Sequence, residues 1–302
     1  MYGFDSNKFY IELKPCTHNV GSPREEFKIR ARLLHYTYKN LILSHSGGTD
    51  SQATFRAFYD EKIPVTCAFM HMPGYNDNEH ANVLAQKEKY NFDLITVTID
   101  PYAVKDEVMQ LSTQLDIPPN QILHSKFLSQ LPADSTFIGG FDGPDLYVKD
   151  KKFYLFETAN SVEYARLRAY DALNINHTVV KFNDDEHILL SILKDDIVEA
   201  ALHAWDYYSI DGLSYLGEEP ISIINYWDLF IKPMFFGKHW KSDIDYYPKY
   251  QGCEKIDYII DGPEHKYREN QIFLEINELM LHLHRGTSVK RYWQRDTSAT
   301  TY

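Results

Sequence analysis

Residues 41–51 read LILSHSGGTDS, and the rest of the chain can be placed around them. The stretch begins with three apolar residues, Leu41 to Leu43, which suit a short buried strand. Gly47 and Gly48 then allow a tight turn, and residues 52–62 can form a helix. In such a turn the backbone N–H groups and the positive end of the helix dipole point at one place. The stretch therefore predicts a loop that binds an anion.

Residues 46–51, SGGTDS, resemble the SGGxDS signature of the PP-loop ATP pyrophosphatases, and every fixed position of that signature is present. The loop lacks the Gly-Lys-Ser/Thr ending of the Walker motif and the G-x-G-x-x-G pattern of dinucleotide-binding folds. The resemblance implies that the loop binds ATP and holds its pyrophosphate. The residues it assigns to the nucleotide are Ser44, Ser46, Gly47, Gly48, Thr49, Asp50 and Ser51. The alternative is a Gly-Ser turn in which Asp50 and Ser51 cap an ordinary helix.

The composition limits the class of protein. The chain has 302 residues, which can form one large domain or two small ones. It has no apolar run of the ~20 residues that a membrane span needs, and its first ten residues do not resemble a signal peptide. We therefore expect a soluble, cytoplasmic protein that does not bind a membrane. A homo-oligomer is left open.

The charge and the cysteines exclude further classes. The formal net charge is −12, whereas tRNA or DNA binding usually requires a broad basic face. A small-molecule substrate is therefore favoured over a nucleic acid. Cys16, Cys67 and Cys253 lie far apart and form neither a CxxC pair nor a zinc spacing, so we expect no disulfide and no cysteine-rich metal site.

Strand and helix patterns alternate on both sides of the loop. Predicted strands lie at residues 41–43, 64–70, 92–99, 136–138 and 178–182, and predicted helices at 24–38, 52–62, 79–90, 102–115 and 121–131. This alternation predicts an α/β fold with a doubly wound, mostly parallel, Rossmann-like sheet. Residues 9–11 are a further candidate, for an edge strand, and residues 146–148 and 153–156 for a hairpin.

A second loop with glycines and aspartates follows the strand at residues 136–138. If this strand lies beside residues 41–43, the two loops face each other where ligands of α/β sheets bind. The second loop begins with Gly139 and Gly140, which we also assign to the nucleotide, and it contains Asp142 and Asp145. It partly resembles the Gly-and-Asp loop of the asparagine-synthetase branch of the superfamily. A solvated turn is the alternative.

Mg²⁺ bound to ATP prefers one or two carboxylates together with phosphate oxygens. Asp50 with Asp142 or Asp145 could supply these carboxylates, and the sequence does not choose between the last two. The adenine is expected at the end of the second strand, near Phe69, Met70 and His71, where main-chain groups can read the base edge. His45 is expected to pack or to orient a neighbour rather than to act as a base.

The pattern changes beyond residue 183. Four helices are predicted there, at residues 186–194, 195–208, 219–230 and 264–285. We therefore expect an ATP-binding domain at residues 1–183 and a mainly helical region at residues 184–302 that completes the substrate pocket.

Basic and aromatic residues combine near the end of the chain. Residues 286–295 contain Lys290 and Arg291 followed by Tyr292 and Trp293. The loop at residues 46–51 contains no lysine, so Lys290 and Arg291 are candidates for the cations that meet the pyrophosphate. We expect this segment to be poorly ordered without ligand and to close over the nucleotide. A frayed chain end is the alternative.

The resemblance implies an ATP- and Mg²⁺-dependent adenylation. A substrate oxygen of a carboxylate, amide or carbonyl would attack the α-phosphate and release pyrophosphate, and a nitrogen or sulfur nucleophile would then displace AMP. Asp50, Lys290 and Arg291 are the expected catalytic residues. Two alternatives stay open. One is a sulfonucleotide reductase, although Cys253 in QGCE does not match the Glu-Cys-Gly context of those enzymes. The other is a nucleotide-binding protein without catalysis.

Overall fold

The computed structural model describes residues 2–5, 8–115, 119–139, 145–149, 152–157, 170, 172–175, 177–182, 185–192, 221–222, 272–275 and 289–294. Among these residues, strands β1, β2, β7, β8, β10, β11 and β12 are described by their backbone only. None of the helices in this part of the chain is long and apolar enough to cross a membrane.

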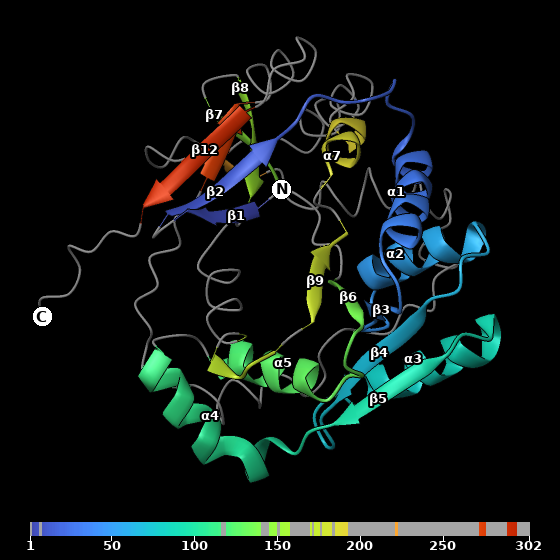
Figure 1. Ribbon diagram of the computed structural model, residues 1–302, viewed down its shortest axis with the longest axis vertical. Coiled ribbons are helices and arrows are strands. Elements are labelled where there is room, and N and C mark those ends of the chain that lie inside the picture. Colours follow the sequence, from blue (N-terminus) through green and yellow to red (C-terminus); the bar gives the residue numbers. More distant parts are fainter. Residues whose placement is uncertain are drawn as a thin grey trace, which may run out of the picture.

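A five-stranded, entirely parallel sheet forms the centre of the fold (Figure 1). Its strands, in spatial order, are β5 (Leu94–Thr98), β4 (Thr66–His71), β3 (Leu41–Ser44), β6 (Thr136–Gly139) and β9 (Thr178–Lys181). Strand β3 is the middle strand, and its Leu43 pairs with Cys67 on one side and Ile138 on the other. The predicted α/β class, the parallel sheet and the placement of residues 136–138 beside residues 41–43 are confirmed.

Helices cover both faces of this sheet. They are α1 (Pro23–Thr37), α2 (Thr49–Asp60), α3 (Asp77–Tyr90), α4 (Pro101–Leu115), α5 (Pro119–Ser129) and α7 (Glu186–Ile192). Ile42 and Ala68 share one buried cluster with Val108 of α4 and Phe127 of α5, so α4 and α5 pack on one face. Helices α1, α2 and α3 lie on the other face (Figure 1). This is the doubly wound arrangement that the alternating pattern predicted.

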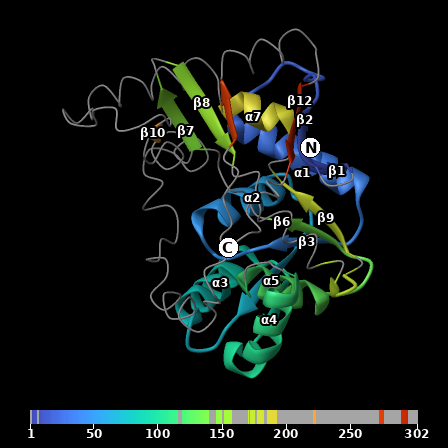
Figure 2. The ribbon, with the colours of Figure 1, turned by 90° about the vertical axis from the view of Figure 1, so that its left-hand side faces the viewer.

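Two smaller antiparallel sheets combine strands from distant parts of the chain (Figure 2). One has the order β1 (Tyr2–Asp5), β2 (Lys8–Leu13), β12 (Val289–Gln294), and the other β10 (Ile221–Ser222), β7 (Asp145–Lys149), β8 (Lys152–Glu157), β11 (Ile272–Glu275). The hairpin of β7 and β8 is confirmed. Residues 9–11 lie in the middle strand of their sheet, so the prediction of an edge strand was wrong.

Two predicted helices contain strand residues. Residues 221–222 pair with β7 and residues 272–275 pair with β8, so the helices at residues 219–230 and 264–285 were wrong at these positions. The residues Ile272 to Glu275, IFLE, are apolar and aromatic enough to pair with the equally apolar β8, and a short run of this kind is ambiguous in sequence. Helix α7 confirms part of the predicted helix at residues 186–194. The boundary at residue 183 stays a prediction, although both smaller sheets join strands from its two sides.

The basic segment near the chain end is also a strand. Residues 289–294 form β12, which pairs antiparallel with β2, and Lys290 lies opposite Glu12. A frayed end, or a lid that is unpaired without ligand, is therefore wrong for these six residues. Their sequence, VKRYWQ, includes Val, Tyr and Trp, which favour strands, and the pairing partner lies about 280 residues away in sequence.

Two neighbouring leucines of α1 test the packing of this helix. Leu34 is 1% exposed, whereas Leu33 is 47% exposed. Leu34→Ala should lower the free energy of unfolding by about 2–5 kcal/mol, because it leaves a cavity. Leu33→Ala is the matched control and should change it by less than about 1 kcal/mol. Urea denaturation measures both, and equal losses would contradict the placement of α1.

Candidate functional site

The SGGTDS loop leaves the middle strand of the sheet and enters α2. Gly48 is the N-cap residue of α2, in extended conformation (φ −73°, ψ 168°), and Thr49 is the first helical residue. Asp50 and Ser51 lie inside the first turn, so neither is the cap that the simpler alternative required. Ser51 Oγ donates to the Gly48 carbonyl at 2.9 Å and lies 3.3 Å from Ser46 Oγ. The loop thus presents two hydroxyls beside the start of a helix, which suits an anion.

The loop lies at the point where the order of the sheet reverses. The chain moves from β3 to β4 and β5 on one side, and then returns to β6 on the other side. Strands β4 and β6 are both parallel to β3, so all three end at the same edge. Ligands of open α/β sheets bind at this position, outside the carboxyl ends of the strands.

Gly47 is the one loop residue whose backbone requires glycine. Its φ of +73° is unfavourable for other residues, and an added Cβ would lie 2.9 Å from Val83 Cγ2 and 3.2 Å from Asn82 Nδ2 of α3. A side chain at residue 47 would therefore clash with α3. The packing of α3 against the loop is therefore a reason for glycine at this position.

Three side-chain amides donate to the carbonyl oxygen of Gly47. The donors are Gln52 Nε2 at 2.9 Å, Asn82 Nδ2 at 2.9 Å and Gln86 Nε2 at 3.2 Å. None of these three residues was predicted to belong to the site. Asn82 and Gln86 are four residues apart and flank Val83, so they share one face of α3 with a buried apolar residue. Polar residues on the inner face of a helix were the sign that could have indicated them.

His45 is completely buried between the loop and the aromatic core. Its Nε2 lies 2.7 Å from Gln86 Oε1, and its ring lies 5.6 Å from that of Phe55 and 5.5 Å from that of Phe92. Burial lowers the pKa of His45 from 6.5 to about 4, so the ring is neutral at pH 7. This position agrees with the packing and orienting role that we expected of it.

The end of β4, where we expect the adenine, carries a stack of rings. His71 stacks on His80 at 4.1 Å, and His80 stacks on Phe69 at 5.4 Å. His71 Nε2 lies 2.8 Å from Asp77 Oδ1, and burial lowers the pKa of His80. The Met70 carbonyl accepts from Asn76 Nδ2 at 2.8 Å, and the His71 carbonyl accepts from Ile99 N–H at 2.8 Å. The carbonyls of Met70 and His71 thus each accept one hydrogen bond within the protein. The adenine site stays a prediction.

The remaining predicted site residues are placed only in part. Gly139 ends β6 beside β3, as expected, whereas Gly140 and Asp142 lie outside the described residues. Asp145 is the first residue of β7, and Lys290 and Arg291 lie in β12. These two strands belong to the smaller sheets and not to the sheet that carries the loop. The metal pair and the cations on pyrophosphate therefore stay predictions.

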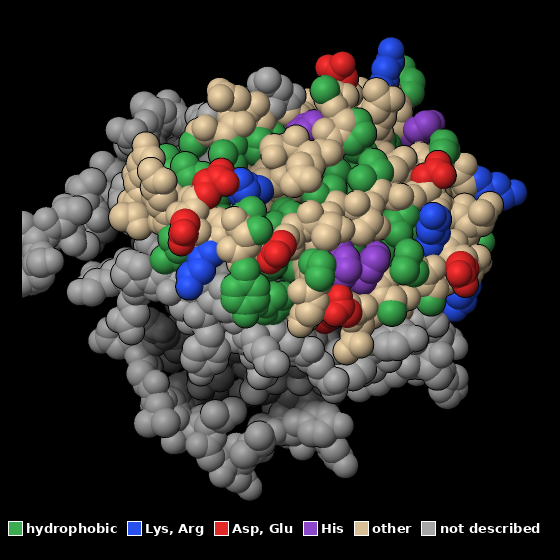
Figure 3. All heavy atoms as spheres, turned by 90° about the horizontal axis from the view of Figure 1, so that it is seen from below, with side chains coloured by type: hydrophobic (Ala, Val, Ile, Leu, Met, Phe, Trp, Pro, Cys, Tyr) green, Lys and Arg blue, Asp and Glu red, His purple; other side chains and the backbone are tan. Residues whose placement is uncertain are grey.

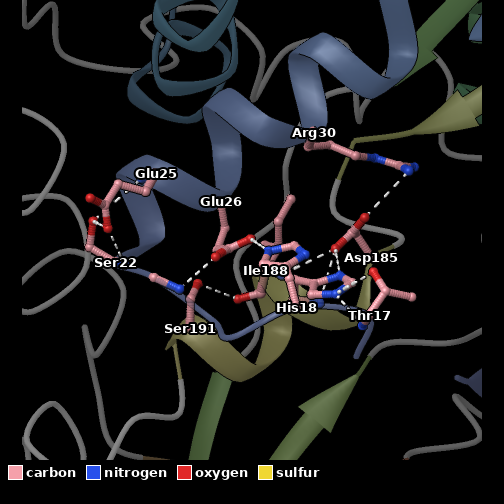
Figure 4. Close-up of polar contacts among 11 residues, drawn as sticks. Thr17, His18, Ser22, Glu25, Glu26, Arg30, Asp185, Ile188 and Ser191 are labelled. Atoms are coloured by element: carbon pink, nitrogen blue, oxygen red, sulfur yellow. Dashed lines mark hydrogen bonds and ion pairs between the residues drawn. The ribbon is translucent and has the colours of Figure 1, made fainter. Parts of the chain in front are cut away.

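A group of possible metal ligands lies at the start of α7, and Figure 4 shows its Asp185 facing Arg30 of α1. Asp185, Glu186 and His187 place one ligand atom each within 4.8 Å of one another. Both ring nitrogens of His187 are already used, because Nε2 accepts from Thr17 N–H at 2.9 Å and Nδ1 lies 3.1 Å from Asp185 Oδ1. Arg30 Nη1 also lies 3.5 Å from Asp185 Oδ2. These contacts tie the segment before α1 to α7, and they give the cluster a structural role.

The surface seen from below shows acidic and basic side chains interspersed over the described part of that face (Figure 3). No continuous basic stretch is visible there among the described residues. The preference for a small-molecule substrate over a nucleic acid stays a prediction from the net charge of −12.

No protein-family model matches the sequence, and no curated protein matches it. Among solved structures, an NMN synthetase from Francisella tularensis aligns with 40% of this chain at 18% identity and a TM-score of 0.31. A U34-tRNA thiolase, NcsA from Methanococcus maripaludis with its 4Fe-4S cluster, aligns with 62% of this chain and 76% of its own at 13% identity and a TM-score of 0.23. The chain spans 56% of the length of the NMN synthetase. Likenesses this weak assign no activity, so the function proposed below depends on the residues of this chain.

The buried His45 predicts a pH dependence of stability. Its pKa is about 4 in the folded protein and 6.5 as an ordinary histidine, so the unfolded chain binds more protons between these values. The contribution of the neutral His45 ring to the free energy of unfolding should be present in full above pH 6.5. About 3 kcal/mol of it should be lost as the pH falls toward 4. Urea denaturation across this range measures the loss. His45→Gln carries no titrating ring and should show a shallower slope, and an identical slope would contradict the assignment.

Proposed function

We propose that this protein binds ATP on residues 46–51 and transfers the adenylyl group to an oxygen of a small-molecule substrate. One observation carries the proposal: the complete SGGTDS sequence lies at the carboxyl end of the middle strand, where the sheet order reverses. A glycine-hydroxyl loop at this position is suited to a phosphate chain. The sequence resemblance to the PP-loop ATP pyrophosphatases assigns the same residues to pyrophosphate.

The loop residues have separate parts in this reaction. The oxygen of the substrate forms a bond to the α-phosphorus, and the bond between that phosphorus and the oxygen leading to the β-phosphate breaks. The loop would hold the departing pyrophosphate by the Gly48 N–H, by the first N–H groups of α2 and by the hydroxyls of Ser46 and Ser51. For this the Ser51 hydroxyl would turn from the Gly48 carbonyl to the phosphate. Fixed donors of this kind stabilise the charge that develops on the leaving group. A nitrogen or sulfur nucleophile would then displace AMP from the substrate.

Asp50 fits the metal that ATP brings. It lies in the first turn of α2, directly after the loop, and it is the loop's only carboxylate. Bound Mg²⁺ would neutralise charge on the phosphates, and oxygen ligands are those it prefers. We propose that Asp142 or Asp145 supplies a second carboxylate to Mg²⁺, and this part of the proposal is based on the sequence alone.

The reductase alternative needs a reactive thiolate, and the described cysteines do not provide one. Burial raises the pKa of Cys16 to about 11, with nearby Glu186, Asp185 and Glu26 adding to the effect. Burial also raises the pKa of Cys67. Both thiols are therefore protonated at neutral pH. Cys253 lies outside the described residues, and its QGCE context does not match that of the reductases.

Replacing Asp50 tests the metal assignment. Wild-type protein incubated with ATP, Mg²⁺ and candidate acceptors should release AMP and pyrophosphate, and Asp50→Asn should reduce the rate by at least about a hundredfold, because a charged ligand is lost. Asp60→Asn at the other end of α2 is the matched control. Asp60 accepts a hydrogen bond from Arg24 at the surface, and we expect it to be dispensable for turnover. Pyrophosphate release by Asp50→Asn at the wild-type rate would refute the metal role.

Replacing Gly48 tests the loop itself. Its extended φ and ψ are open to any residue, so Gly48→Val should fold. The branched side chain would nevertheless stand beside the N–H groups that we assign to the phosphates, and ATP affinity should fall at least about tenfold. Calorimetric titration of ATP, with circular dichroism as the folding control, measures the effect. If Gly48→Val binds ATP with wild-type affinity, the loop is a turn and not a phosphate site. If the wild-type protein binds ATP but forms no AMP from it, the protein is a nucleotide-binding protein without catalysis.

A further inference from the structure

Three buried amides hold one backbone oxygen, that of Gly47, in the middle of the anion loop. Gln52 reaches it from α2, and Asn82 and Gln86 reach it from α3, at 2.9, 2.9 and 3.2 Å. All three side chains are at least nine-tenths buried. A carbonyl oxygen has two lone pairs, so a single donor would already spare it the cost of burial. Three donors from two helices exceed what satisfying this oxygen requires.

Donor and acceptor rules fix the orientation of each group in this cluster. Gln86 Nε2 donates both to the Gly47 oxygen and to Asn82 Oδ1 at 3.1 Å. Gln86 Oε1 is then the atom that faces His45 Nε2 at 2.7 Å, and it must accept. His45 therefore carries its proton on Nε2. The result is a directed chain in which His45 orients Gln86, and Gln86 and Asn82 together orient the Gly47 carbonyl.

The direction of this carbonyl determines the direction of the next N–H. The described residues contain no cis peptide bond, and in a trans peptide the C=O and the N–H of the following residue point in opposite directions. Because the Gly47 oxygen points at α3, the Gly48 N–H points away from α3. Its contact in the structure is Ser46 Oγ at 3.3 Å, the long limit of a hydrogen bond. A phosphate oxygen is a better acceptor for this N–H than a hydroxyl at that distance.

We infer that Gln52, Asn82 and Gln86 are positioning residues of the anion loop, which they act on through the Gly47–Gly48 peptide, and that His45 holds Gln86 in place. This inference rests on the proposed function, since it assigns the Gly48 N–H to the phosphate chain of ATP. All three amide side chains are buried, so we assign none of them a direct contact with the nucleotide. Without their donors the peptide can rotate, and the Gly48 N–H is no longer fixed toward the phosphate.

Binding of inorganic pyrophosphate tests the inference without depending on turnover. Gln86→Met keeps the length of the side chain and removes its donors, and we expect the dissociation constant for pyrophosphate to rise at least tenfold. The amide resonance of Gly48 in ¹⁵N-labelled protein should shift as well. Leu128→Ala is the control, because Leu128 is fully buried in α5 on the opposite face of the sheet. It should lower the melting temperature and leave both the affinity and the Gly48 resonance unchanged.

A second variant covers the case in which Gln86→Met does not fold. Gln52→Met removes one donor from α2 and leaves the chain from His45 to Asn82 intact, so it should weaken pyrophosphate binding to a smaller extent.

The outcomes separate the inference from the proposed function. Wild-type affinity in folded Gln86→Met, or in Gln52→Met if Gln86→Met does not fold, overturns the inference and leaves the proposed function standing. An equal loss in Leu128→Ala also overturns the inference, because stability alone would then explain the effect. Pyrophosphate binding that depends on Gln86, in a protein that forms no AMP from ATP, supports the inference and refutes the adenylation. A wild-type protein that does not bind pyrophosphate refutes both.

Discussion

The orientation of one peptide, that between Gly47 and Gly48, connects the main features of this structure. Its carbonyl is held by side chains of α2 and α3, and its left-handed Gly47 leaves no room for a side chain against Val83. The same peptide lies in the loop that joins the middle strand of the sheet to the first turn of α2. The loop conformation is thus set by the packing of two helices on the sheet. A rigid scaffold of this kind can hold donors in place before a ligand arrives.

The topology of the sheet explains why the loop stands where it does. Strand β3 lies between β4 and β6, and the chain crosses from one face of the sheet to the other between β5 and β6. The carboxyl ends of β3 and β6 therefore lie side by side at one edge of the sheet. A phosphate chain placed there would meet backbone donors from the loop after β3, with the ends of β4 and β6 on its two sides.

Patterns that are local in sequence predicted the central sheet and the loop. Short apolar runs, glycines and helical periodicity gave all five parallel strands, the five helices between residues 23 and 129 and the reversal of strand order at residues 136–138. The pairing of β12 with β2 and of β11 with β8 was not predicted, because it joins residues more than a hundred positions apart. Apolar residues such as Ile272 and Ile276 have helical spacing within the helix predicted at residues 264–285, yet residues 272–275 form a strand that pairs with β8. Tertiary pairing there prevailed over local periodicity.

The motif of the candidate site was predictable from the sequence, whereas the side chains that hold the loop in place were not. SGGTDS is continuous in sequence, so its residues could be named at once. Asn82 and Gln86 lie more than thirty residues from Gly47, and their role depends on how α3 packs against the loop. A single sequence does not contain that packing. The same limit applies to His45. Phe55, Phe92 and Gln86 surround its ring, and burial among them lowers its pKa and keeps the ring neutral.

A crystal structure with Mg²⁺ and an ATP analogue that has a methylene bridge between its α- and β-phosphates would test the central claim most directly. Such an analogue cannot release pyrophosphate, so it should remain bound. The account predicts phosphate oxygens within hydrogen-bonding distance of the Gly48 N–H and of the Ser46 and Ser51 hydroxyls, with the Gly47 carbonyl still directed at Asn82 and Gln86. A phosphate chain bound away from residues 46–51 would contradict it.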